Sequence, residues 1–65
     1  MQMTINGRER DIIAGDVAGL LQELGLDASR VAVELNRGIV LSANFAQTPL
    51  AAGDSIEIVQ FVGGG

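Results

Sequence analysis

The sequence predicts a small α+β domain in which one helix packs on one face of a mixed sheet of four or five strands. Short stretches with an apolar residue at every second position occur near both ends and in the middle of the chain, as expected of half-buried strands. One intervening stretch has apolar residues spaced three and four apart, as in an amphipathic helix. Glycine-containing turn sequences separate these stretches.

The first expected element is a β-hairpin. Residues 1–5 (MQMTI) alternate between apolar and polar side chains, which favours a short half-buried strand. Asn6 and Gly7 follow, and both tolerate the positive φ of a type I′ turn. Residues 8–14 (RERDIIA) then return as a second strand, although their alternation is poor.

A short helix is expected next. Asp16 is a good N-cap, because its carboxylate can accept hydrogen bonds from the first free N–H groups. Gly25 can take the left-handed conformation that ends a helix, and Leu26 can then pack back on the last turn. A single apolar stripe along this helix faces the sheet and consists of Val17, Leu20, Leu21 and Leu24.

The second half of the chain predicts the rest of the sheet. Residues 30–36 form a third strand, and a turn at 36–38 leads to a brief return strand. An irregular connection follows, in which Phe45 and Leu50 are the expected core anchors. Residues 55–61 (SIEIVQF) carry apolar residues on both faces, which is typical of a central strand. This order of elements indicates a β-grasp (ubiquitin-like) roll.

Composition limits the function. With 65 residues the chain forms one domain, and it has neither Cys nor His for disulfides, common zinc sites or nucleophilic catalysis. A net charge of −4 without any Lys argues against nucleic-acid binding and suits a partner with a basic docking surface. No apolar run is long enough for a bilayer and no signal peptide is recognisable. We therefore expect a cytoplasmic protein that binds no membrane.

The carboxylates predict no acid/base pair. Asp16 is accounted for as a helix cap and Asp54 as a turn residue, and Glu34 and Glu57 are expected on the solvated surface of strands. No glycine fingerprint for phosphate binding occurs. The sequence thus predicts a protein that is not itself an enzyme and holds no bound cofactor.

The last five residues, FVGGG, raise a different possibility. Termini usually fray, yet here three glycines follow the last strand directly. Residues 1–61 are expected to form the domain, and residues 62–65 a flexible glycine tail. Fully extended, Val62 to Gly65 can span roughly 14 Å, and a segment with so few side chains can enter a narrow channel of a partner.

The group that such a tail would deliver is the α-carboxylate of Gly65. A carboxylate is inert towards nucleophiles at neutral pH, but ATP can convert it to an acyl-adenylate with a good leaving group. Attack by sulfur would then give a thiocarboxylate. A protein used in this way needs no catalytic side chains of its own.

The sequence resembles the ThiS/MoaD superfamily of ubiquitin-like sulfur carriers, and within it the ThiS family of thiamine biosynthesis, over essentially the whole chain. The stretches that carry the resemblance are TING near the start, DVAGLLQELGLD (16–27), VAVELN (31–36) and TPLAAGDSIEIVQFVGGG (48–65). No single stretch is very specific. Their ordered set, ending in two glycines, is specific.

The resemblance implies a β-grasp carrier that is a monomer when free. Its partners would be an ATP-dependent adenylating enzyme (ThiF/MoeB-like), a thiazole synthase (ThiG-like) and, indirectly, a cysteine desulfurase or another sulfur donor. The adenylating enzyme would use ATP to activate Gly65, which then becomes the thiocarboxylate. Gly64 and Gly65 would be the functional diglycine, and Val62 and Gly63 would belong to the inserted tail.

The chain departs from the family pattern in one region. Arg37 intervenes in the sequence NRG, and Leu41 and Phe45 stand where family members often have Pro and Trp. An exposed patch of Ile39, Leu41 and Phe45 is a candidate docking surface, although packing of Phe45 in the core is the preferred alternative.

Other functions remain open at this point. The resemblance also fits the small subunit of molybdopterin synthase or a carrier for another sulfur-transfer pathway. A ubiquitin-like modifier attached to protein amines and a β-grasp interaction module with an inert tail are further alternatives.

Overall fold

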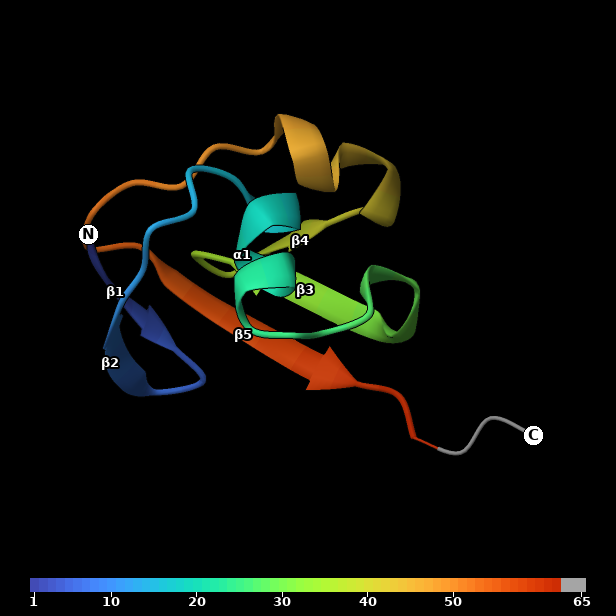
Figure 1. The fold of residues 1–65 in the computed structure, drawn as a ribbon. Coiled ribbons are helices and arrows are strands. Elements are labelled where there is room, and N and C mark those ends of the chain that lie inside the picture. Colours follow the sequence, from blue (N-terminus) through green and yellow to red (C-terminus); the bar gives the residue numbers. More distant parts are fainter. Residues whose placement is uncertain (63–65) are drawn as a thin grey trace.

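The computed structural model describes residues 1–62 and confirms the predicted β-grasp roll. A five-stranded sheet lies against one α-helix, with two short 3₁₀-helices, η1 and η2, beside them (Figure 1). The elements are β1 (Gln2–Ile5), β2 (Arg8–Asp11), α1 (Val17–Glu23), η1 (Ala28–Arg30), β3 (Val31–Leu35), β4 (Gly38–Val40), η2 (Ser42–Gln47) and β5 (Ser55–Gln60). Of the predicted tail, residues 62–65, only Val62 is among the described residues.

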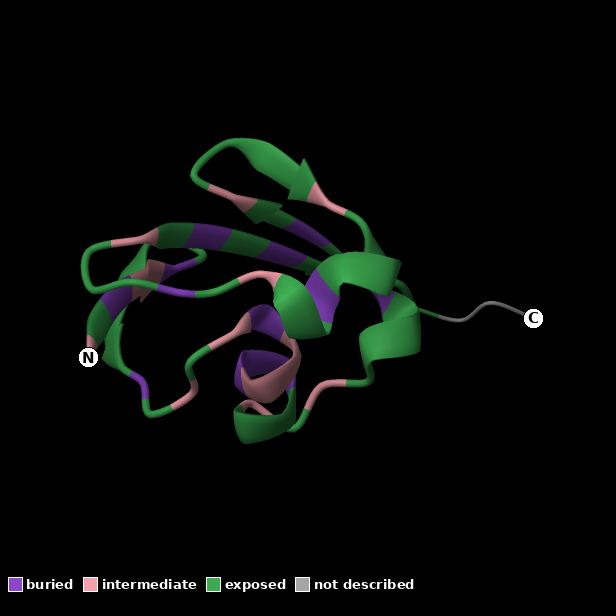
Figure 2. Ribbon diagram, turned by 90° about the horizontal axis from the view of Figure 1, so that it is seen from above, coloured by how far each residue is buried: buried purple, intermediate pink, exposed green. Residues whose placement is uncertain are grey.

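The sheet has the strand order β2-β1-β5-β3-β4. β1 and β5 run parallel, and the other neighbouring strands pair antiparallel. The last strand is therefore central, as its apolar residues on both faces predicted. Figure 2 shows buried and exposed residues alternating along β3 and β5, because α1 covers one face of the sheet and the other face is open to solvent.

The core lies between α1 and the covered face of the sheet. Ile56 near the start of β5 and Leu20 in α1 have no exposed surface. Phe45 and Leu50 contribute from the η2 connection, as predicted. The buried apolar side chains are Met3, Ile5, Ile12, Val17, Leu20, Leu21, Val31, Val33, Phe45, Leu50, Ile56 and Ile58.

The helix begins and ends as its sequence predicts. The Oδ1 atom of Asp16 accepts a hydrogen bond from the backbone N–H of Gly19 at 2.7 Å. At the other end Gly25 has a φ of +73°, and the N–H of Leu26 donates to the carbonyl of Leu21 at 2.8 Å. Together with the hydrogen bond from the N–H of Gly25 to the carbonyl of Gln22 at 3.0 Å, this second bond defines a Schellman motif, which satisfies carbonyls that the helix leaves free and turns the chain back towards the sheet.

The turn between β1 and β2 does more than reverse the chain. Asn6 and Gly7 both have positive φ, +50° and +81°, which confirms the expected type I′ turn. The side chain of Asn6 also reaches β5: its Oδ1 accepts from the N–H of Ile58 at 2.7 Å, and its Nδ2 donates to the carbonyl of Ile58 at 3.1 Å. The amide thereby continues the pairing of β1 with β5 beyond the end of β1. The sequence predicted a role for Asn6 in the turn only, and that prediction was incomplete.

The Asn6→Gly variant is expected to lose about 2 kcal/mol of the free energy of unfolding. Glycine keeps the positive φ without strain but removes both hydrogen bonds to Ile58, each of which contributes about 1 kcal/mol. Urea unfolding of both proteins measures the difference. Arg8→Ala in the same hairpin, an exposed position, should change stability by less than about 0.5 kcal/mol; equal losses in both variants would contradict the assigned role of the amide.

The second hairpin has a two-residue turn between the paired residues Leu35 and Gly38. Asn36 and Arg37 occupy it with φ of +49° and +72°. The side chain of Asn36 bonds across to the start of β5, accepting from the N–H of Ser55 at 2.9 Å. Arg37 therefore stands in a conformation that glycine adopts at lower cost.

Candidate functional site

β5, the central strand of the sheet, is followed by Phe61 and Val62, the last residues that the structure describes (Figure 1). Beyond its last residue, Phe61 is held by its backbone, since its N–H donates to the carbonyl of Arg30 at 2.8 Å. The side chain of Phe61 is 58% exposed and that of Val62 is 91% exposed. Gly63, Gly64 and Gly65, the predicted tail and modification site, lie outside the described residues. The described chain thus provides the base of the predicted tail.

Around this base the open face of the sheet is apolar. The register places Ala32 opposite Val59, and the outward alternation continues to Leu41 beside Ala32 and to Phe61 beyond Val59. Ile39 lies on the same face, opposite Glu34. We call this surface the sheet-face patch; its residues are Ala32, Ile39, Leu41, Val59 and Phe61, and all five side chains are exposed.

The structure corrects one of the three predicted docking residues. Ile39 and Leu41 lie in the sheet-face patch, with 78% and 64% of their surfaces exposed. Phe45 is only 4% exposed and belongs to the core, which confirms the preferred alternative for this residue and excludes it from an exposed patch. The reason is that η2 crosses the covered side of the sheet and contacts α1, so an aromatic ring on its inner side fills the core.

Sequence reasoning missed Val59 and Phe61 as surface residues. Their alternation with Ile56 and Ile58 was visible, and it indicated apolar residues on both faces. The sequence does not show which of the two faces the helix covers, because that depends on packing between distant segments. The structure shows it.

The charges that border the sheet-face patch are of opposite sign at its two ends. Glu34 and Glu57 lie directly opposite each other on neighbouring strands, and both are exposed. Within residues 1–62 neither carboxylate forms an ion pair. At the other end Arg30 lies beside Phe61 in the register, and its Nε atom is 3.7 Å from Oδ2 of Asp27.

Asp27 neutralises that second end. Hydrogen bonds from the hydroxyl and the backbone N–H of Ser29 lower the pKa of Asp27, with a smaller contribution from the charge of Arg30. Its carboxylate therefore stays ionised and partners Arg30 at neutral pH. At the other end the carboxylates of Glu34 and Glu57 share their hollow with the guanidinium of Arg37.

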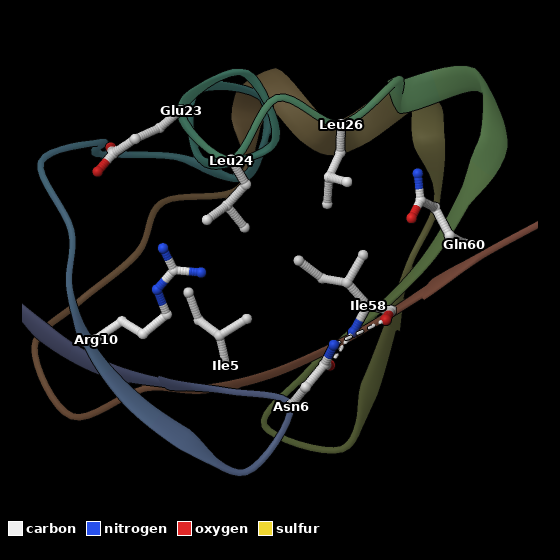
Figure 3. A pocket seen from close by; sticks show the side chains of 8 residues that line it. All are labelled: Ile5, Asn6, Arg10, Glu23, Leu24, Leu26, Ile58 and Gln60. Carbon is white, nitrogen blue, oxygen red and sulfur yellow. Dashed lines mark hydrogen bonds between the residues drawn. The ribbon is translucent and has the colours of Figure 1, made fainter.

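A cleft of about 320 Å³ opens on the opposite, helix-bearing side (Figure 3). Its apolar wall consists of side chains from the sheet and from the end of α1, and Arg10 points into it. The carboxylate of Glu23 at its rim is occupied, since Oε1 accepts from the N–H of Ala14 at 2.8 Å. The lining residues are Ile5, Asn6, Arg10, Glu23, Leu24, Leu26, Ile58 and Gln60.

The described residues hold no arrangement for catalysis by a metal. In residues 1–62 no group of three or more Asp or Glu side chains could hold a metal ion. None of the helices in this range is long and apolar enough to cross a membrane. The features that remain for function are the sheet-face patch and the chain that leaves it.

This domain, a β-grasp roll with its last strand at the centre of the sheet, belongs to the ubiquitin-like class of folds. Comparison with known proteins gives the family: the model of the ThiS family matches residues 3–65. The chain belongs to the ThiS family.

Individual relatives agree with this assignment. A sulfur carrier protein ThiS of Thermus thermophilus is 33% identical, over 94% of this chain and 95% of its own length. The crystal structure of a thiamine biosynthesis protein (ThiS) from Geobacter metallireducens superposes with a TM-score of 0.85 at 33% identity, over 100% of both chains. A thiazole synthase of Paramagnetospirillum magneticum is 48% identical over 100% of this chain, which spans 20% of the length of that protein.

Proposed function

We propose that this chain is a sulfur carrier that supplies sulfur for thiazole formation in thiamine biosynthesis. The observation that carries the proposal is the match to the ThiS family across residues 3–65, which includes all three glycines after Val62. The ThiS protein of Thermus thermophilus, with nearly the same length, is named as a sulfur carrier. The composition agrees, because a carrier needs none of the nucleophilic or metal-binding residues that this chain lacks.

The proposed chemistry takes place on the carboxylate of Gly65 in two steps. One carboxylate oxygen attacks the α-phosphorus of ATP on an adenylating enzyme, which forms an acyl-adenylate and releases pyrophosphate. Hydrosulfide, or a donor that delivers it, then attacks the carbonyl carbon. The bond from that carbon to the AMP oxygen breaks, AMP leaves with the electron pair, and the attacking sulfur loses its proton. The product is a thiocarboxylate.

The fold places the start of the predicted tail at the end of the central strand. β5 lies between β1 and β3, so the base of the tail continues from a strand that is paired on both sides. Phe61 is the last residue with a backbone hydrogen bond to the sheet region within residues 1–62. Four residues, Val62 to Gly65, then span at most roughly 14 Å, which sets how deep a partner site can lie.

The proposed partners follow from the same steps. An ATP-dependent adenylating enzyme would activate Gly65, with sulfur delivered indirectly from a cysteine desulfurase, and a thiazole synthase would accept it. The relatives named thiazole synthase support the second partner, since a segment similar to this entire chain forms 20% of each of two such proteins. The chain itself would act as a co-substrate and not as a catalyst.

Intact-mass spectrometry tests the proposal. After incubation with ATP, a sulfide source and the cognate adenylating enzyme, the chain is expected to gain the mass difference between one sulfur and one oxygen atom. Fragmentation should place the gain on Gly65, and omission of ATP should abolish it. An unchanged mass, with an enzyme preparation that modifies a known carrier, would contradict the proposed function.

A further inference from the structure

We propose that the sheet-face patch and the adjoining Glu34–Glu57 pair form the docking surface for the thiazole synthase. The contact surface of that enzyme would have an apolar centre with an arginine or lysine side chain facing the two carboxylates. This inference rests on the proposed function and adds the recognition chemistry of the partner.

The patch is a continuous surface. Ala32 and Val59 lie opposite each other on β3 and β5, and Leu41 directly follows Val40, the β4 residue that pairs with Val33 next to Ala32. Ile39 adjoins these residues on β4 and Phe61 adjoins them past the end of β5. Large apolar side chains exposed side by side on a sheet mark an interaction surface more often than isolated ones do.

The acidic pair gives this surface its charge preference. Like charges directly opposite each other on neighbouring strands destabilise a sheet, and no ion pair within residues 1–62 relieves Glu34 and Glu57. Arg37 lines the same shallow hollow without forming an ion pair in the described part of the chain. A cation from a partner placed over the hollow would remove the repulsion and gain two charged hydrogen-bond acceptors.

The position of the patch ties it to the protein that receives the tail. Phe61 belongs to the patch, Val62 follows it, and the glycines follow Val62. A protein that covers the patch therefore also borders the first residues of the tail. Thiazole synthase is the occupant that the comparisons favour, because a segment similar to this entire chain is part of two proteins of that name.

Binding measurements with the full chain and its cognate thiazole synthase test this. By isothermal titration calorimetry, the double variant Glu34→Gln/Glu57→Gln is expected to bind about tenfold more weakly, with a reduced dependence on salt. Its melting temperature should rise, because the repulsion between the two carboxylates is gone. Val59→Ser should also bind about tenfold more weakly, since an apolar contact is lost. Glu9→Gln, which removes one charge at the far edge of the same face, should change affinity less than twofold.

Two outcomes would overturn the inference. Native affinity for the synthase in the double variant would show that the acidic pair takes no part in docking. A loss of affinity for the adenylating enzyme alone would assign the surface to that enzyme. Thiocarboxylate formation and sulfur transfer by the native chain, measured separately, report on the proposed function, so the two ideas can fail independently.

Discussion

The Ile56→Ala variant is expected to lose most of the stability of this domain. Ile56 has no exposed surface and lies in the central strand, paired with Ile5 on one side and Leu35 on the other. Removing its outer carbons forfeits burial and leaves a cavity, which costs about 3–4 kcal/mol. A domain of this size has a free energy of unfolding of roughly 3–10 kcal/mol, so the variant should be largely unfolded or melt far below the native chain.

Val59→Ala provides the matched control for that experiment. It shortens an apolar β-branched residue in the same strand, but the side chain is 60% exposed on the open face of the sheet. We expect a change of less than about 1 kcal/mol in the free energy of unfolding, measured by urea denaturation for both variants. If Val59→Ala cost as much as Ile56→Ala, the assignment of covered and open faces would be wrong.

Local chemistry explains how much of the fold the sequence could predict. The turn at Asn6-Gly7, the cap at Asp16 and the helix end at Gly25 depend on residues close in the chain, and the structure confirms each. The central position of β5 was also predictable, because a strand with apolar residues on both faces needs neighbours on both sides.

Long-range contacts explain what could not be predicted. The amide of Asn6 bonds to Ile58, 52 residues away, and that contact exists only because β1 and β5 are parallel neighbours in this register. The residues of the sheet-face patch could not be predicted for the same reason, because they too depend on how distant strands pair. Until the strand order is known, the sequence does not show which face of the predicted strand 55–61 the helix covers, so the exposure of Val59 could not be predicted.

In the candidate site, too, some residues could be predicted from the sequence and others could not. Gly64 and Gly65 were predicted from the family pattern at the end of the sequence, and they lie outside the described residues, so their role stays a prediction. Ile39 and Leu41 were predicted as a docking surface and are exposed, as that role requires. The pairing of Glu34 with Glu57 needed the β3–β5 register, which the alternation in each strand does not give.

A chain with one alanine added after Gly65 is expected to form no detectable thiocarboxylate. If an adenylating enzyme receives the tail in a narrow channel, the added residue moves the carboxylate by about 3.5 Å and brings in a Cβ atom. Misplacement of a reacting group by that distance is enough to reduce a rate by orders of magnitude. Intact mass after incubation with ATP, a sulfide source and the enzyme measures the result.

Stability separates this effect from misfolding. The last buried side chain in residues 1–62 is Ile58, so an addition after Gly65 should leave the melting temperature unchanged. Gly63→Ala keeps the chain length and the position of the carboxylate, and it should retain more activity than the extended chain. A thiocarboxylate formed on the added alanine at the native rate would contradict this prediction. It would mean that the enzyme accepts the carboxylate at different distances from the folded domain. In that case the length of the glycine segment would not limit how deep the site in the partner can lie.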